Sequence, residues 1–195
     1  MLPDGAGVIL AARILGYRDS GRVAGPTLML ELCDRGREFG WRHFFYGGAD
    51  GVADELAMRL KAKFPGLEVA GTCCPPFRVL TPEEQSDNIS RIDSTRPNIV
   101  WVGLGAPKQD IWMADNYRRL NGATLIGVGA AFDFHAGRVR WAPTWIRRMG
   151  CEWAYRFYQE PRRMWRRNLD SPRFVLHVLL QRLGNLFRLL DRNSH

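Results

Sequence analysis

The apolar positions of the chain fall into short unbroken runs that alternate with segments of helical spacing. Residues 99–102 lack polar alternation, which is typical of a strand buried on both faces of a sheet, and residues 124–128 indicate a second apolar strand. Residues 43–46 and 67–70 indicate two further short strands. The repeated order of strand and helix predicts an α/β fold, a Rossmann-like and mostly parallel sheet with helices on both faces.

The helical segments carry their own start and stop signals. Thr81, Pro82 and Glu84 form a helix start with a threonine cap, proline at the first position and glutamate at the third. The expected helices cover residues 8–15, 22–33, 52–63, 81–94 and a segment that opens at Pro107, while residues 71–77 are expected to form a stiff loop.

Residues suited to bind a ligand follow two of the predicted strands. The glycine-rich residues 103–105 turn the chain tightly, and Lys108 and Gln109 then stand at a helix start, where free N–H groups and the helix dipole favour an anion. A second glycine-rich loop follows residues 124–128, with Asp133 just beyond it. We therefore expect Lys108, Gln109 and Asp133 on one rim of the sheet, where such folds bind ligands.

Each of these features also has a purely structural interpretation. Gly-x-Gly follows a strand in many proteins without a ligand there, and a lysine beside a glutamine is often a solvated helix end. Asp4, beside Gly5, is either a carboxylate presented at a sheet edge or a turn or cap residue. Arg22 is either a phosphate contact or an ordinary surface charge. The density of such residues at two neighbouring strand ends favours a site.

The positive charge of the chain lies in its last third. Residues 136–195 hold 13 arginines and four acidic residues, a net charge of +9, whereas residues 1–135 hold 15 basic and 16 acidic residues. Arginine suits recognition of phosphate or diphosphate, although an idle solvated segment would have the same composition. Together with the many aromatic residues there, this predicts a core of residues 1–137 and a basic helical appendage of residues 138–195.

The end of the appendage has the pattern of an amphipathic helix. Residues 173–190 combine a wide apolar face with a basic strip, which suits the interface of an anionic membrane or, alternatively, packing on the domain or a partner subunit. The segment is too short and too charged to span a bilayer.

The four cysteines do not form a disulfide framework or a zinc pair. Cys73 and Cys74 are adjacent, Cys33 and Cys151 stand alone, and there is no CxxC. Reduced thiols in a cytosolic protein are the simplest account, and the opening residues lack a secretory signal.

Several motifs, taken together, resemble one protein family. The chain resembles the WecG/TagA/CpsF family of bacterial glycosyltransferases over nearly all of residues 3–168. The matching runs are residues 3–8, 22–25, 45–48, 102–109, 127–134, 136–137, 142–143, 152–153, 155–156 and 160–163. The resemblance implies a Rossmann-like core with a C-terminal appendage, in agreement with the pattern above.

The resemblance also implies a reaction, in which a sugar moves with inversion from a UDP-sugar to a polyprenyl-diphosphate-linked sugar for capsular, exopolysaccharide or teichoic-acid-type synthesis. Neither a metal nor a cofactor is implied. By motif match, Asp4 is the candidate base. Arg22, Lys108, Gln109 and Asp133 are candidates for the donor site, with Asp133 toward the nucleoside and Gln109 toward sugar or phosphate. Three arginines of the appendage would hold the diphosphate in place of a metal: Arg156, Arg163 and Arg166.

The partners implied are the donor, the lipid-linked acceptor and an anionic membrane surface on the inner face of the bacterial plasma membrane, where the protein would be peripheral. A second copy of the chain in a homo-oligomer is a further candidate. The family's segment before residues 3–5 has no counterpart here, so leading strands are expected to be missing. An alternative is therefore a truncated, inactive member that acts as a membrane-associated binding subunit.

Two other classes of function fit the pattern less well. Interleaved arginine and aromatic residues in the appendage would suit nucleic acid, but the neutral core and the amphipathic final helix argue against it, and no nucleic-acid partner is expected. A nicotinamide-dependent oxidoreductase would need GxGxxG after the first strand with an acid about 20 residues on, and the sequence lacks that arrangement.

Overall fold

The computed structural model describes residues 6–17, 23–120, 122–149, 151–159, 161, 177–178 and 180–181. The chain divides into two compact units, residues 25–140 and residues 1–24 together with 141–195. The predicted division into residues 1–137 and 138–195 stays a prediction.

The unit of residues 25–140 is built on a parallel sheet, as predicted. The strands in this described part are β1 (Arg42–Gly47), β2 (Glu68–Cys73), β3 (Ile99–Gly103) and β4 (Thr124–Gly127), in the order β2-β1-β3-β4. All three strand pairs are parallel. The fold class expected from the sequence is therefore confirmed.

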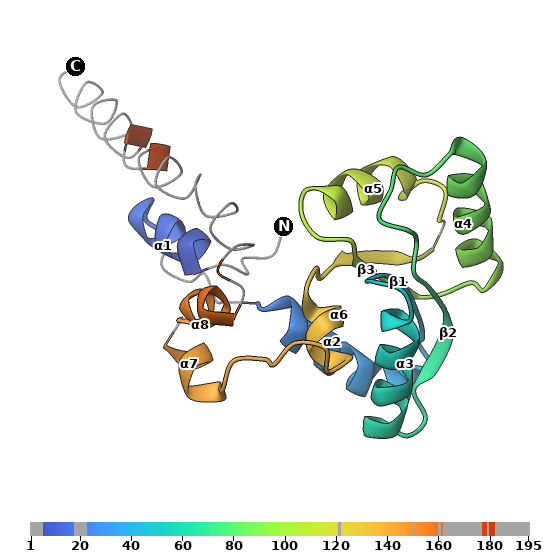
Figure 1. The fold of residues 1–195 in the computed structure, drawn as a ribbon, viewed down its shortest axis with the longest axis horizontal. Helices are drawn as coiled ribbons and strands as arrows, with labels where there is room; N and C mark the ends of the chain where they lie inside the picture. Colours follow the sequence, from blue (N-terminus) through green and yellow to red (C-terminus); the bar gives the residue numbers. More distant parts are fainter. Residues whose placement is uncertain are drawn as a thin grey trace, which may run out of the picture. The chain divides into compact units, whose positions relative to one another are not determined.

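Helices cover both faces of this sheet (Figure 1). One face packs against α2 (Gly25–Arg35), α3 (Val52–Lys63) and α6 (Ala131–His135), and the other packs against α4 (Pro82–Ser94) and α5 (Lys108–Asn116). A short 3-10 helix, η1 (Gly36–Phe39), follows α2. The second unit contains α1 (Ala6–Ile14), α7 (Thr144–Arg148) and α8 (Glu152–Gln159).

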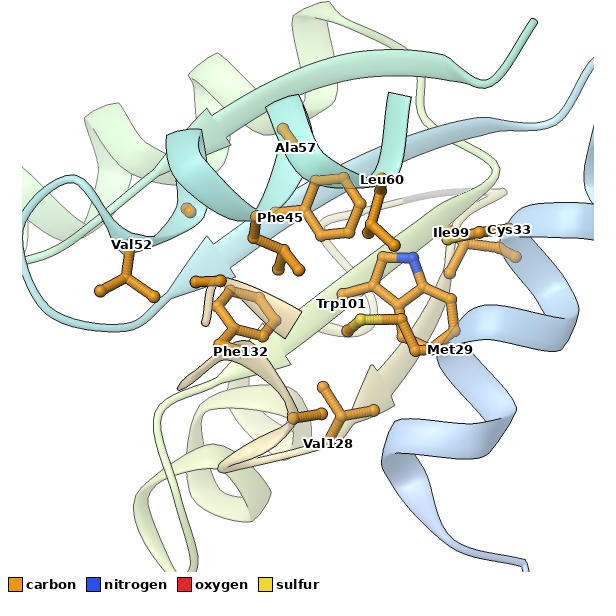
Figure 2. Close-up of a cluster of buried hydrophobic side chains, with 14 of the residues drawn as sticks. Met29, Cys33, Phe45, Val52, Ala57, Leu60, Ile99, Trp101, Val128 and Phe132 are labelled. Atoms are coloured by element: carbon orange, nitrogen blue, oxygen red, sulfur yellow. The ribbon is translucent and has the colours of Figure 1, made fainter. Parts of the chain in front are cut away.

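Alternate residues of the central strands enter two separate apolar cores. Phe45 and Trp101 pack with Met29 and Leu60 on the face of α2 and α3 (Figure 2), whereas Phe44 and its neighbours face α4 and α5. Burying each large side chain contributes about 1.5–3 kcal/mol. Two covered faces explain why these strands are unbroken apolar runs.

The second strand extends further than the sequence indicated. Residues 71–73, expected to begin a loop, continue β2 because Gly71 pairs with Phe44 and Cys73 with Tyr46 of β1. A Cβ at Gly71 would lie 2.7 Å from Cε2 of Phe44. The glycine therefore makes room for the phenylalanine ring instead of breaking the strand.

The predicted helix signals hold where the structure describes them. Thr81 Oγ1 accepts a bond from the Glu84 amide at 3.2 Å, and Glu84 Oε2 accepts one from the Thr81 amide at 2.9 Å. The helix expected from residue 22 begins at Gly25. Most of residues 173–190 lie outside the described residues. Within the described ranges, none of the helices has the length and apolar character needed to cross a bilayer.

Candidate functional site

The carboxyl ends of β1, β3 and β4 meet at one edge of the sheet. Gly47 pairs with Gly103, and Val102 pairs with Gly127. The Gly48 amide donates to the Gly103 carbonyl at 3.1 Å, and the Val128 amide donates to the Val102 carbonyl at 2.9 Å. The loops that leave these three strands therefore begin side by side, as the topology of a parallel sheet requires.

Glycine at this edge allows close approach of the backbone. A Cβ at Gly47 would lie 2.6 Å from the carbonyl carbon of Gly103, and a Cβ at Gly103 would lie 2.7 Å from the ring of Phe132. The sequence predicted a tight turn at residues 103–105, but of these residues only Gly105, at φ +76, has the left-handed conformation that such a turn needs. Gly103 instead leaves room for the ring of Phe132, which packs directly against it.

That ring fixes the position of α6. Phe132 is buried, and its ring meets Phe45 edge-on with the centroids 6.1 Å apart (Figure 2). The next residue is the half-buried Asp133. Asp133 therefore lies on a short helix above the strand ends and not in the loop before it.

The helix that follows β3, α5, contacts the sheet and the turn after β4 through its side chains. Trp112 stacks on Tyr46 with the ring centroids 4.4 Å apart. Gln109 reaches across to the turn after β4, where its Oε1 accepts a bond from the Gly129 amide at 3.0 Å. Lys108 is exposed at the start of α5. The structure thus brings Lys108, Gln109 and Asp133 to one edge, as predicted.

The start of α5 is less open to an anion than the sequence suggested. The amides of Gln109, Asp110 and Ile111 donate to the carbonyls of Gly105 and Pro107 at 2.9–3.2 Å. Attraction for an anion at this helix start therefore rests mainly on the Lys108 ammonium and the helix dipole.

The remaining predicted site residues lie elsewhere in the chain. Asp4, Arg22, Arg163 and Arg166 are outside the described residues. Arg156 is half-buried on α8, in the second unit.

Within that second unit, Trp141, which precedes α7, contacts a side chain of α7 and one of α8. The Trp141 indole N–H donates to Glu152 Oε1 at 3.0 Å, and the Arg147 guanidinium lies 3.8 Å from the centroid of the Trp141 ring. Across the residues that the structure describes, no three His, Cys, Asp or Glu side chains are grouped as a cation site.

A buried histidine near the start of β1 was missed by the sequence argument. His43 is fully buried, and its Nδ1 accepts a bond from the Trp101 indole N–H at 3.0 Å. Burial lowers the pKa of His43 to about 4 and raises the pKa of the neighbouring Cys33 thiol to about 12. Because His43 pairs with Ile99, at the opposite end of β3 from the glycine-rich edge, we interpret it as a core residue.

The chain is similar to known proteins over most of its length. The family model of the glycosyl transferase WecG/TagA/CpsF family matches residues 1–188. The chain belongs to this family. The match spans the carboxyl edge of the sheet as well as α7 and α8, and it confirms the family expected from the motifs. The chain is therefore a glycosyltransferase.

Two relatives carry a more specific name, N-acetylglucosaminyldiphosphoundecaprenol N-acetyl-beta-D-mannosaminyltransferase. The relative from Bacillus spizizenii is 36% identical over 180 residues, which cover 92% of this chain and 67% of the relative. The relative from Bacillus subtilis is 32% identical over 180 residues, which cover 92% of this chain and 68% of the relative.

Proposed function

We propose that this glycosyltransferase moves an N-acetylhexosamine from a UDP-sugar to a sugar linked to a polyprenyl diphosphate. The observation that carries the proposal is the 36% identity over 180 residues to a relative whose name states a transfer of this kind. The carboxyl edge of residues 25–140 supports it, because the Lys108 ammonium on α5 and the Asp133 carboxylate on α6 both lie at that edge. The backbones of β1 and β3 are closely packed there.

The donor is proposed to bind at this edge. Lys108 at the start of α5 would attract the diphosphate, and Asp133 on α6 would accept hydrogen bonds from the nucleoside. Arg22 is a further candidate for the diphosphate. A cation beside the diphosphate stabilises the negative charge that develops as UDP leaves.

The chemistry is proposed to be a single displacement. Asp4 takes the proton from the acceptor hydroxyl, the hydroxyl oxygen bonds to the anomeric carbon of the donor sugar, and the bond from that carbon to UDP breaks. Attack from the face opposite to UDP inverts the anomeric centre. Arg156, Arg163 and Arg166 supply the counter-charge for a diphosphate, so no metal is required.

The place of action is proposed to be the inner face of the bacterial plasma membrane. The acceptor is a membrane lipid, and residues 136–195 carry a net charge of +9 that an anionic surface attracts. We propose that the protein is peripheral there and that it acts in the synthesis of a cell-surface polymer.

Turnover tests the proposal. Purified chain is mixed with UDP-N-acetylmannosamine and N-acetylglucosaminyl diphosphoundecaprenol in EDTA, and UDP release and product mass are followed. We expect a product one N-acetylhexosamine heavier and a loss of kcat of about 100-fold or more in Asp4→Asn, because a general base contributes 10²–10⁴-fold.

Asp19→Asn is the matched control, since it removes a carboxylate from the same N-terminal segment without touching the motif, and we expect it to keep the wild-type kcat. Absence of product from the wild-type chain, with these and other UDP-N-acetylhexosamines, would contradict the proposed reaction. Full activity of Asp4→Asn would contradict the role of Asp4 as the base but would leave the proposed reaction standing.

A further inference from the structure

The side chain of Gln109 joins two elements that are far apart in the sequence. Its Oε1 accepts a hydrogen bond from the amide of Gly129 at 3.0 Å, across 20 residues of chain. A Cβ at Gly127 would lie 2.9 Å from Gln109 Nε2 and 3.1 Å from its Cδ. The carboxamide therefore contacts both ends of the turn formed by residues 127–129.

The bond to Gly129 also sets the orientation of the carboxamide. A backbone amide only donates, so the atom that faces it must be the oxygen, and Nε2 lies on the side of Gly127. Gly129 has φ +50, a left-handed conformation in which its amide points at α5. Loss of the acceptor would leave this part-buried amide unpaired, which is costly enough to let the turn rearrange.

The turn leads directly into α6. The Val128 amide is fixed to the β3 carbonyl of Val102, and the Ala131 amide donates back to the Val128 carbonyl at 3.1 Å. Phe132 then sits on Gly103. Between these two anchors, the Gly129 amide donates to Gln109 Oε1, so this bond holds the turn that leads from β4 to Asp133.

We propose that Gln109 is a positioning residue of the donor site: its carbonyl oxygen holds the 127–129 turn and, through α6, sets the place of Asp133. This inference rests on the proposed function, in which Asp133 contacts the nucleoside. It differs from the role expected from the motif, a direct contact of Gln109 with sugar or phosphate, because it acts through another residue.

The first test asks, without any ligand, whether Gln109 protects the Gly129 amide. Hydrogen exchange of the Gly129 amide is followed by NMR in the wild-type chain, Gln109→Ala and Gln109→Glu. Glutamate keeps an oxygen at the position of Oε1, so we expect wild-type protection in Gln109→Glu and at least tenfold faster exchange in Gln109→Ala. Gln85→Ala, on α4, is the matched control and is expected to leave the Gly129 amide unchanged. Equal exchange in wild type and Gln109→Ala would overturn the proposal.

The second test asks whether Gln109 acts through Asp133. UDP affinity is measured by titration calorimetry for the wild-type chain, Gln109→Ala, Asp133→Asn and the double variant. We expect Gln109→Ala to weaken UDP binding about tenfold in the wild-type background and less than twofold when Asp133 is already replaced. A tenfold loss in both backgrounds would mean that Gln109 contacts UDP directly and would overturn the positioning role.

The two tests separate failure of this inference from failure of the proposed function. Absence of UDP binding by the wild-type chain contradicts the donor site and with it the role assigned to Gln109 there. The exchange rate of the Gly129 amide then still decides whether Gln109 holds the turn of residues 127–129.

Discussion

Replacement of Gly47 by alanine is expected to destabilise the fold by about 3 kcal/mol or more. The new Cβ would lie 2.6 Å from the carbonyl carbon and 2.7 Å from the carbonyl oxygen of Gly103. Both atoms belong to the backbone of β3, which pairs on both sides and has little freedom to move. Overpacking costs about 1–3 kcal/mol, and the φ of +126 adds a similar cost for any residue with a Cβ.

The measurement is the free energy of unfolding in urea, with Gly66→Ala as the matched control. Gly66 also has a left-handed φ, +87, but a Cβ there would meet nothing within 4 Å. The control therefore carries only the backbone cost, about 1–2 kcal/mol. Equal losses in Gly47→Ala and Gly66→Ala would contradict the close approach of β1 and β3 at the proposed site.

Acidification is expected to destabilise the fold by about 3 kcal/mol through His43. Burial lowers the pKa of His43 in the folded state to about 4, below its ordinary value of 6.5. As the pH falls from 6.5 to 4, the unfolded chain takes up a proton that the folded chain does not, so stability decreases over that window. Above pH 6.5 both states hold a neutral ring and the contribution vanishes.

The same conclusion follows from the hydrogen bond. A doubly protonated ring has no acceptor for the indole N–H of Trp101, so protonation also breaks the bond that His43 makes to β3. Urea unfolding of the wild-type chain and His43→Gln at several pH values between 4 and 7.5 tests this. We expect a shallower dependence on pH in the variant, and equal dependence in both proteins would show that His43 is not the group responsible.

Local patterns were sufficient to predict most of the sheet. The unbroken apolar run at residues 99–102 is buried in the sheet, the run at residues 124–128 contains the partly buried edge strand β4, and the Thr81 signals start α4 as expected. These features depend on residues close together in the sequence. Neighbouring parallel strands then place Lys108, Gln109 and Asp133 at a common edge without any knowledge of side-chain contacts.

The features that were missed depend on contacts between distant residues. Gly71 looks like a strand breaker until the ring of Phe44 is known to fill the space beside it. Gly103 looks like a turn residue until Phe132, 29 positions later, is seen on top of it. The bond between Gln109 and Gly129 has no local signature either. Close packing at the site is thus a tertiary property, although the residues that form it are visible as a cluster of glycines.

The central claim is that the carboxyl edge of residues 25–140 binds the UDP part of the donor. Titration of UDP into the ¹⁵N-labelled chain, followed by amide chemical shifts, tests it most directly. We expect saturable shifts at Gly105, Gln109, Gly129 and Asp133, with the amide of Gly66, at the opposite end of the sheet, unmoved. Shifts confined to the Gly66 end, or no saturable shift at the carboxyl edge, would contradict the claim.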